Sequence, residues 1–165
     1  MYRSDFQCAV ALSMAIAFAA IAAAETPADP ISVRSIAEVE LRTTEHGREI
    51  TKLAPADRLV SGDWVIYTLE VRNTAAASVR APTVSFPVPP HLTYVAESAV
   101  GPGTEISFSV DGGSSFDSPD NLKVRDAGGG QRPAGAADYT HIRWQFKNAL
   151  KGNSVAFVRF RARVK

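Results

Sequence analysis

Oxygen-bearing side chains gather in one short stretch of the chain and could together hold a metal ion. They are Asp111, Asp117, Asp120 and Asn121, and two glycines lie among them. Calcium prefers several carboxylate and carbonyl oxygens, so an oxygen-rich loop is a candidate calcium site. The spacing does not match the twelve-residue calcium loop of the EF-hand. Because Asp, Asn and Gly are also the residues that turns favour, we prefer turn formation and keep calcium as the alternative.

Side chains for nucleophilic or acid–base catalysis form no known motif in this chain. The three histidines, His46, His91 and His141, lie far apart, each beside a predicted turn. The chain lacks the Gly-x-Ser-x-Gly, His-Glu-x-x-His and phosphate-loop patterns, and glycines 128–130 follow no strand-to-helix context. The single cysteine, Cys8, lies in an N-terminal apolar run, which excludes thiolate chemistry from the rest of the chain. The sequence therefore predicts a protein that is not an enzyme and needs no cofactor.

A row of arginines in the final predicted strand is a candidate interaction surface. Arg159, Arg161 and Arg163 occupy alternate positions and so share one strand face. A basic stripe could bind anionic polymers or lipid headgroups of the envelope. The alternative, which we prefer, is pairing with Glu38 and Glu40 on the first predicted strand, because first and last strands are often neighbours in sandwiches. Opposite charges that face each other across strands contribute about 0.2–1 kcal/mol each.

The two tryptophans could serve a ligand site or the core. Trp144 alternates with Ile142 and Phe146, which predicts a core position. Trp64 directly precedes a predicted strand and is out of phase with its apolar face, so it could be exposed and stack on a sugar. Packing at a sheet edge is the preferred alternative for Trp64. The interaction candidates are therefore Trp64, Arg159, Arg161 and Arg163.

Alternation of apolar and polar residues predicts strands along most of the chain. The clearest case is residues 65–72, where Val65, Tyr67, Leu69 and Val71 share one face. Further strands are expected at residues 31–44, around residues 50–53, and at residues 83–88, 92–95, 105–110, 139–146 and 155–164. Residues 60–95 are expected to form a two-strand ribbon. Residues 126–138, rich in Gly, Ala and Pro, are expected to form a surface loop.

Short strands with Gly- and Pro-rich turns, and no amphipathic helix, indicate a sandwich or barrel. We predict an all-β fold, an immunoglobulin-like antiparallel β-sandwich of about seven to nine strands, over residues 31–165. The cysteine pair of antibody domains is absent, so the expected likeness is one of architecture only. No internal repeat of fixed period is present, which excludes a solenoid or propeller.

The N-terminal residues predict export. An uninterrupted run of apolar and small residues spans positions 8–23 and ends in alanines, the layout of a secretory signal peptide. The expected organisation is a signal peptide at 1–24, a proline-containing linker at 25–30 and one domain at 31–165. A retained N-terminal anchor is the alternative. We expect a periplasmic or secreted protein, without a membrane span after cleavage near Ala24, and the net charge of +1 gives no sign of nucleic-acid binding.

Several strand and turn motifs resemble those of a bacterial family. In chain order they are Gly62-Asp63, Tyr67-Thr68, Asn73-Thr74, Pro89-Pro90 and Leu92-Thr93-Tyr94-Val95, then residues 108–113 and Ile142-Arg143-Trp144. The pattern resembles a conserved repeat domain of unknown function, an immunoglobulin-like or prealbumin-like module of exported and surface proteins. The resemblance covers most of residues 60–164 and implies a fold without a chemistry. Ala75 replaces a usual glycine, and Phe86-Pro87 stands near a usual aspartate, so any site that uses that aspartate would be missing here.

These observations predict an exported, non-enzymatic domain that acts as a structural or protein-interaction module at the cell envelope. Its expected partners are envelope or surface proteins. The alternative is a β-sandwich module that binds carbohydrate or another ligand through exposed aromatic side chains. Glycan binding that is lost on Trp64→Ala would favour this alternative.

Overall fold

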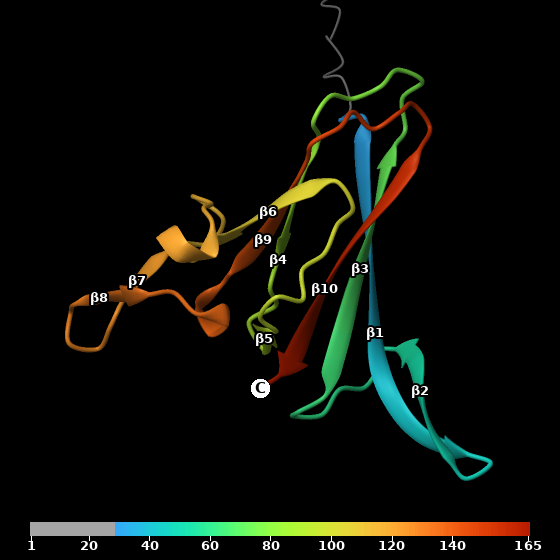
Figure 1. The fold of residues 1–165 in the computed structure, drawn as a ribbon, viewed down its shortest axis with the longest axis vertical. Helices are drawn as coiled ribbons and strands as arrows, with labels where there is room; N and C mark the ends of the chain where they lie inside the picture. The colour runs from blue at the N-terminus through green and yellow to red at the C-terminus, as the bar shows by residue number, and fades with distance from the viewer. Residues whose placement is uncertain (1–28) are drawn as a thin grey trace, which may run out of the picture.

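The protein is all-β, and its strands form antiparallel sheets arranged like a sandwich (Figure 1). The structure is a computed structural model that describes residues 29–165. The predicted signal peptide at 1–24 and most of the predicted linker lie outside the described residues. The expectation of an all-β antiparallel fold is confirmed.

The larger sheet has five strands in the order β2-β1-β3-β10-β5. The strands are β1 (Ile31–Glu45), β2 (Arg48–Pro55), β3 (Trp64–Asn73), β5 (Leu92–Tyr94) and β10 (Val155–Val164). The alternation predicted for residues 65–72 is confirmed, because Val65, Leu69 and Val71 are fully buried on one face of β3. Strands β1 and β10 both pair with β3, which therefore lies inside the sheet.

The smaller sheet has three strands in the order β4-β9-β6. They are β4 (Thr83–Pro87), β6 (Thr104–Ser109) and β9 (His141–Phe146). A separate ribbon of β7 (Lys123–Arg125) and β8 (Gln131–Pro133) projects at the left of Figure 1. Two short 3-10 turns, η1 (Pro119–Asn121) and η2 (Ala136–Asp138), flank this ribbon.

Two sequence predictions about these elements are wrong. Residues 60–95 do not form a two-strand ribbon, because β3 belongs to the larger sheet and β4 to the smaller one. The segment between them carries the chain across the sandwich, which a tight hairpin turn could not do. Residues 126–138 are not loop throughout, because β8 lies within them and pairs with β7. Alternation over three residues is too short to distinguish such a ribbon from a loop.

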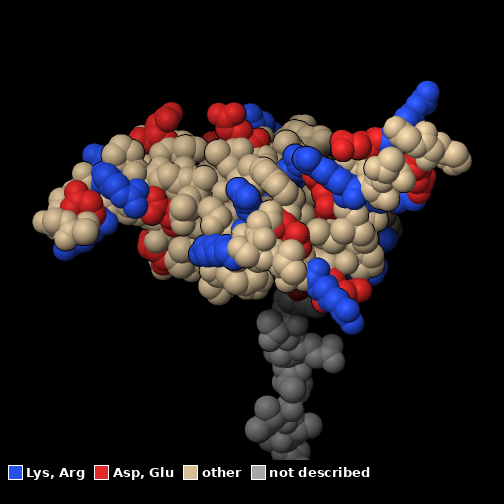
Figure 2. Space-filling view, turned by 90° about the horizontal axis from the view of Figure 1, so that it is seen from below, with Lys and Arg blue, Asp and Glu red and all other residues tan. Residues whose placement is uncertain are grey.

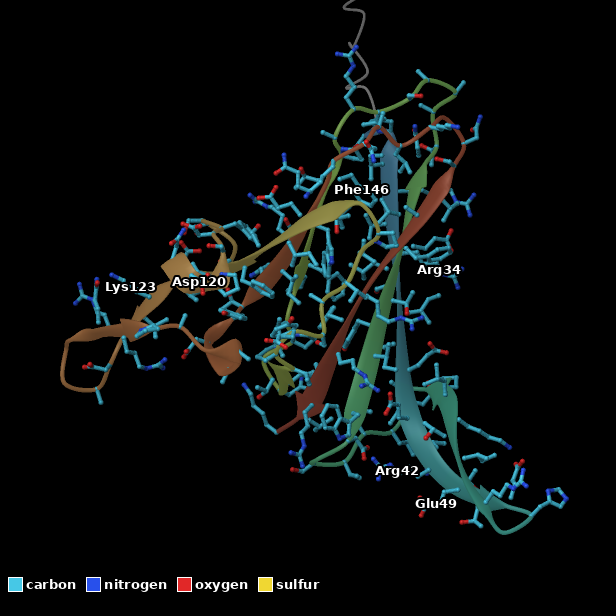
Figure 3. All side chains as sticks on the ribbon, in the orientation of Figure 1. Arg34, Arg42, Glu49, Asp120, Lys123 and Phe146 are labelled. Atoms are coloured by element: carbon cyan, nitrogen blue, oxygen red, sulfur yellow. The ribbon has the colours of Figure 1, made fainter. Side chains whose placement is uncertain are left out.

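Aromatic side chains from both sheets fill the core. Trp144 of β9 and Phe160 of β10 are fully buried, with ring centroids 6.2 Å apart. Tyr67 of β3 stacks on Phe160 at 5.0 Å and lies 5.7 Å from Phe86 of β4. Phe146 also lies between the sheets (Figure 3). Because aromatic rings bury large areas, these contacts across the gap hold the sheets together.

Strand β1 is shared between two neighbours. Residues 31–39 pair with β3, and residues 38–45 pair with β2. The β1–β2 hairpin therefore extends beyond the sandwich, at the lower right of Figure 1. Arg42 and Glu49 lie on this projection (Figure 3). Its turn uses His46 and Gly47 at positive φ, as the sequence predicts.

Asn73, at the end of β3, joins three segments of backbone. Its side chain is fully buried, and Nδ2 donates to the carbonyl oxygens of Ala77, Leu150 and Lys151 at 2.8, 3.0 and 3.1 Å. Its Oδ1 accepts from the N–H of Ala75 at 3.0 Å. The sequence marks Asn73 only as a turn residue. The structure shows that it fixes the crossing from β3 toward β4 against the turn that leads into β10.

Candidate functional site

The predicted arginine row lies on the outer face of the five-stranded sheet, opposite the core. Residues 159, 161 and 163 of β10 stand directly beside Thr68, Ile66 and Trp64 of β3. Ile66 and Thr68 are only 5% and 8% exposed although they point away from the core. We attribute this burial to the arginine side chains, whose apolar stems can lie along a sheet surface while the charged ends reach water.

One arginine makes the predicted type of ion pair, but the strand order assumed for it is wrong. The prediction placed the first and last strands side by side, whereas β3 lies between β1 and β10. Arg161 reaches across β3 to the carboxylate of Glu40 on β1. Glu38 is in none of the ion pairs found within residues 29–165. The pairing interpretation therefore holds for Glu40 alone.

The other two arginines bind uncharged oxygens. Arg159 Nε donates to the hydroxyl of Thr68 at 3.1 Å. Arg163 Nε donates to the carbonyl of Gly62 at 3.3 Å. Neither is among the ion pairs of the described chain, so their positive charges remain available to a partner. Elsewhere the charge is mixed: on the face shown in Figure 2, Lys and Arg alternate with Asp and Glu.

Trp64 begins β3 at the same end of the outer face. It is 38% exposed, and the guanidinium carbons of Arg161 and Arg163 lie 5.7 and 5.9 Å from its ring centroid. These are cation–π distances, so two arginines help to hold the ring. An open hollow of about 460 Å³ lies beside it, lined by Glu40, Leu41, Arg42, Gly62, Asp63 and Trp64.

Apolar side chains are exposed in the middle of the same face. Ile36, Val100 and Phe157 are 37%, 52% and 53% exposed. They surround Thr68 and Arg159, since Ile36 pairs with Thr68, Thr68 with Arg159, and Arg159 with Val100. An open hollow of about 470 Å³ is lined by Thr68, Val100, Phe157 and Arg159. We call Ile36, Val100, Phe157 and Arg159 the outer-face patch.

Sequence reasoning did not select the apolar members of this patch. Phe157 lies two residues before Arg159 and therefore on the same strand face as the arginines, so its outward position could be predicted from the sequence. Val100 belongs to no alternating segment, because it lies in a loop that pairs with β10 only through an isolated bridge to Arg159. Such a contact joins residues far apart in the chain, so local periodicity cannot reveal it.

The acidic stretch proposed as a calcium site forms turns in the structure. Asp111 accepts hydrogen bonds from the Ser115 hydroxyl at 2.6 Å, the Ser115 N–H at 2.9 Å and the Ser109 hydroxyl at 2.7 Å. These bonds, those of Ser115 foremost, hold the pKa of the Asp111 carboxyl well below its usual range. Gly112 and Gly113 both adopt positive φ, as the predicted turn requires.

Of the remaining calcium candidates, Asp117 and Asn121 are hydrogen-bonded to each other. Asp117 accepts from Asn121 Nδ2 at 2.9 Å and from the Ser118 N–H at 2.7 Å, and these bonds lower the pKa of Asp117. Asp120 is exposed in η1, near the projecting ribbon (Figure 3). Within residues 29–165, no group of three or more His, Cys, Asp or Glu side chains is placed to hold a metal ion. Turn chemistry accounts for this stretch.

The three histidines lie in separate parts of the fold. His46 is in the turn of the projecting hairpin, His91 precedes β5, and His141 begins β9. His141 Nδ1 lies 3.3 Å from the Thr140 hydroxyl, and its ring packs beneath Gly113. The histidines are not among any potential metal ligand group in the described chain. The structure therefore does not bring them together.

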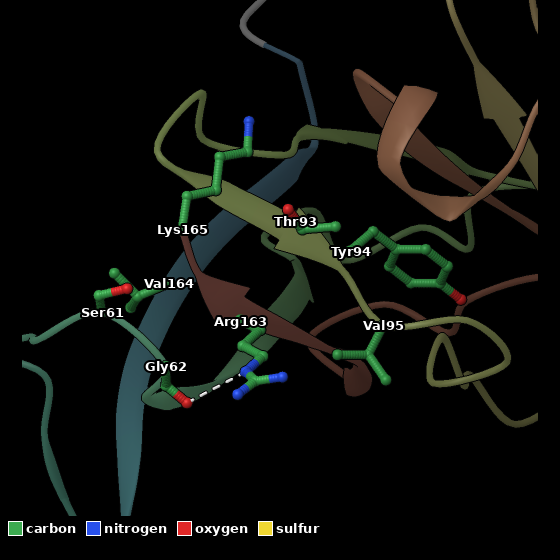
Figure 4. Close-up of a pocket in the computed structure, with 8 residues that line it drawn as sticks. All are labelled: Ser61, Gly62, Thr93, Tyr94, Val95, Arg163, Val164 and Lys165. Carbon is green, nitrogen blue, oxygen red and sulfur yellow. Dashed lines mark hydrogen bonds between the residues drawn. The ribbon is translucent and has the colours of Figure 1, made fainter.

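An open hollow of about 420 Å³ lies at the end of β10 (Figure 4). It is lined by Ser61, Gly62, Thr93, Tyr94, Val95, Arg163, Val164 and Lys165. Its two cations are already engaged, because Arg163 donates to Gly62 and Lys165 Nζ donates to the carbonyl of Pro90 at 2.7 Å. The lining contains no Asp, Glu or His side chain.

A further hollow, of about 470 Å³, opens where β5 and β6 approach the two 3-10 turns. Its floor holds Phe108 stacked on Tyr139 at 4.4 Å, with Tyr94 at 5.2 Å from Phe108. Burial, and then the neighbouring Tyr94 and two aspartates, raises the pKa of Tyr139. The three rings are at most 9% exposed, so they serve mainly as core.

No family model, curated protein or solved structure matches the chain. Within residues 29–165, no helix combines the length and apolar character needed to cross a membrane.

Proposed function

We propose that this chain is an exported, immunoglobulin-like β-sandwich without enzymatic activity, which acts as a structural or protein-interaction module at the cell envelope. The observation that carries the proposal is the outer-face patch. Exposed Ile36, Val100 and Phe157 surround Arg159 on the face of a sheet whose other face is core. Interfaces favour such aromatic and Arg side chains in a central patch with a polar rim.

The surroundings of this patch suit a protein partner better than a small substrate. The hollow at its centre is open and is lined by Thr68 and Arg159 together with two apolar side chains. The neighbouring charges include Glu70, which lies opposite Phe157 and is paired with Arg72, and Arg161, which is paired with Glu40. A partner with apolar side chains and a carboxylate would cover Phe157 and reach Arg159. The rigid sheet supplies a preformed surface, which lowers the entropic cost of binding.

Site-specific photo-crosslinking in the native host tests this surface. A photoreactive phenylalanine analogue at Phe157 should give discrete adducts with the same envelope or surface proteins in replicate experiments. The matched control places the analogue at Glu105, which is exposed on β6 of the other sheet. Arg159→Glu in the Phe157-labelled protein should abolish the adducts. Identical adducts at both positions, or none at Phe157, would refute a role for this face.

Carbohydrate binding is the second candidate function, and the hollow beside Trp64 favours it. A partly exposed indole next to Glu40, Arg42 and Asp63 combines a stacking surface with hydrogen-bonding groups. Glycan-array binding by the full-length chain, lost on Trp64→Ala and kept in Phe157→Ala, would support this function. Crosslinking at Phe157 without glycan binding would support the first.

A further inference from the structure

One side of β1 has no neighbouring strand along its first seven residues. Residues 31–39 pair with β3 on one side, but pairing with β2 on the other side starts only at Glu38. Within the part of the chain that the structure describes, residues 31–37 of β1 therefore form an open sheet edge. We call this segment the β1 edge.

Two backbone hydrogen bonds show which groups of the β1 edge point outward. Thr74 N–H donates to the carbonyl of Pro30, so even-numbered residues bond toward β3. Ala56 N–H donates to the carbonyl of Ala37, so odd-numbered residues bond away from β3. The outward N–H of Ile31 is bound by Asp29 Oδ1 at 2.9 Å. The remaining outward groups are the carbonyl of Ile31, both groups of Val33 and Ser35, and the N–H of Ala37.

The strands that border the sheets, β2, β4, β5 and β6, carry features that discourage strand addition. Strand β4 follows Pro82 and ends at Pro87, and the three-residue β5 follows Pro89 and Pro90. Strand β2 carries Arg48, Glu49 and Lys52 and ends at Pro55. Strand β6 is bridged by Asp117 through two hydrogen bonds with Phe108. Proline, charge, short length and covering segments are the usual protections of edges. The β1 edge has no proline between residues 31 and 37 and a single charge, Arg34.

The side chains of the β1 edge indicate which strand would fit. Val33, on the core side, is 44% exposed and Ile36, on the outer side, is 37% exposed. Arg34 is exposed on the outer side, in none of the ion pairs of residues 29–165, and points away from the smaller sheet (Figure 3). In a second copy paired antiparallel about the middle of this edge, Arg34 would face or neighbour its equivalent. Like charges there are destabilising, so the edge favours a partner over a second copy.

We propose that the β1 edge binds an extended segment of a partner protein by antiparallel strand addition. The segment carries a carboxylate opposite Arg34 and apolar side chains opposite Val33 and Ile36. Main-chain hydrogen bonds provide the affinity, and the alternating side chains provide the specificity. Arg34 and its opposite residue form a non-hydrogen-bonded pair, in which side chains approach most closely. The proposal rests on the proposed role as an interaction module. It shares Ile36 with the outer-face patch, but uses the open backbone edge of β1 instead of the sheet face around Phe157.

The probe is the capped, fluorescein-labelled peptide TVTEVTT, whose glutamate lies opposite Arg34 when its two valines face Ile36 and Val33. The control peptide is TVTKVTT. Fluorescence anisotropy with the full-length chain should show that TVTEVTT binds about tenfold more tightly, since the change exchanges a like-charge pair for an opposite-charge pair. Arg34→Glu should reverse the preference. Arg42→Glu, on the projecting hairpin, alters the net charge equally and should leave the preference unchanged.

A backbone variant tests the hydrogen bonds independently of charge. Ser35→Pro removes an outward N–H without removing a bond to β3, so it should weaken both peptides at least about tenfold. Ser35→Thr keeps the N–H and should bind as the natural chain does; equal thermal stability of the two variants shows that both fold. Equal effects of Arg34→Glu and Arg42→Glu, unchanged binding by Ser35→Pro, or no binding of either peptide at millimolar concentration would each overturn the proposal. A homodimer that Ser35→Pro dissociates would instead assign the edge to a second copy, whatever the crosslinking at Phe157 shows.

Discussion

Truncation of Asn73 should cost a large part of the free energy of unfolding. The buried amide of Asn73 satisfies three backbone carbonyls and one N–H, at distances of 2.8–3.1 Å. Its two amide hydrogens and one oxygen make about three full hydrogen bonds, each with a net contribution of about 1 kcal/mol. Asn73→Ala also removes the donor of the Ala77 carbonyl, whereas the carbonyls of Leu150 and Lys151 keep the N–H groups of Val79 and Ser154. The expected loss is about 3–4 kcal/mol, a substantial share of the roughly 5–15 kcal/mol typical of a domain.

Urea denaturation followed by tryptophan fluorescence measures this loss. Asn148→Ala is the matched control, because Asn148 is exposed in the turn after β9, and it should change the free energy of unfolding by less than about 0.5 kcal/mol. A loss below about 1 kcal/mol for Asn73→Ala, with an unchanged denaturant slope, would refute the assigned role of the amide.

Asn73→Asp adds a pH-dependent test of the same contacts. An ionised carboxylate at this position would face carbonyl oxygens in a buried site, so its pKa in the folded state would be raised above the unfolded value. The folded state would then bind more protons, and the free energy of unfolding of Asn73→Asp should increase as the pH falls through the raised pKa. Asn73→Ala should lack this increase. Parallel pH profiles of the two variants would contradict the proposed geometry.

Three further perturbations follow from contacts in the structure. Gly152→Ala should destabilise the fold by about 3 kcal/mol or more in the same denaturation assay, because a Cβ there would lie 1.8 Å from a backbone oxygen. Gly135→Ala, which has room for a methyl group, should have a small effect. Glu40→Lys should lower the melting temperature through loss of about 0.5–1 kcal/mol, whereas Glu38→Lys should change it less; the reverse order would contradict the pairing with β10. Turn hydrogen bonds lower the pKa of Asp111, so its stabilising effect should be complete above about pH 4–5 and should be lost as the pH falls toward the folded-state pKa. In Asp111→Asn, the free energy of unfolding should therefore fall less steeply at acid pH.

The strands could be predicted because alternation is a local property of the chain. Residues 65–72 and 155–164 contain long runs with a period of two, and both are strands with one face in the core. The turns at His46-Gly47 and Gly112-Gly113 were also predictable, since glycine is the residue that best accepts positive φ. These features need no knowledge of which strands are neighbours.

Strand order could not be predicted, because it depends on contacts between distant residues. The alternation of β3 and β4 is the same whether they pair or lie in different sheets. Glu40 and Arg161 were paired by an assumed adjacency of β1 and β10, yet the pair forms because an arginine side chain is long enough to cross β3. The role of Asn73 was missed for a related reason: two of its acceptors lie 77 and 78 residues away.

The candidate site was predictable in its charges but not in its apolar part. The phase of the strand placed Arg159, Arg161 and Arg163 on one face, and the structure brings Trp64 to the same face. Exposure of Val100 and Ile36 depends on which neighbours cover them. The β1 edge likewise exists only because β2 ends its pairing at Glu38, which no local pattern of β1 reveals.

The position of β10 between β3 and β5 has a kinetic consequence. Thr68 and Arg159, which are hydrogen-bonded across the centre of the larger sheet, are 91 residues apart in the chain. Closing such a long loop costs entropy before any pairing compensates for it, and folds dominated by distant pairings form slowly. Until β10 adds, β3 has β1 on one side and unsatisfied amides on the other. Refolding yield should therefore depend on protein concentration, because β10 competes with other molecules for β3 during this interval.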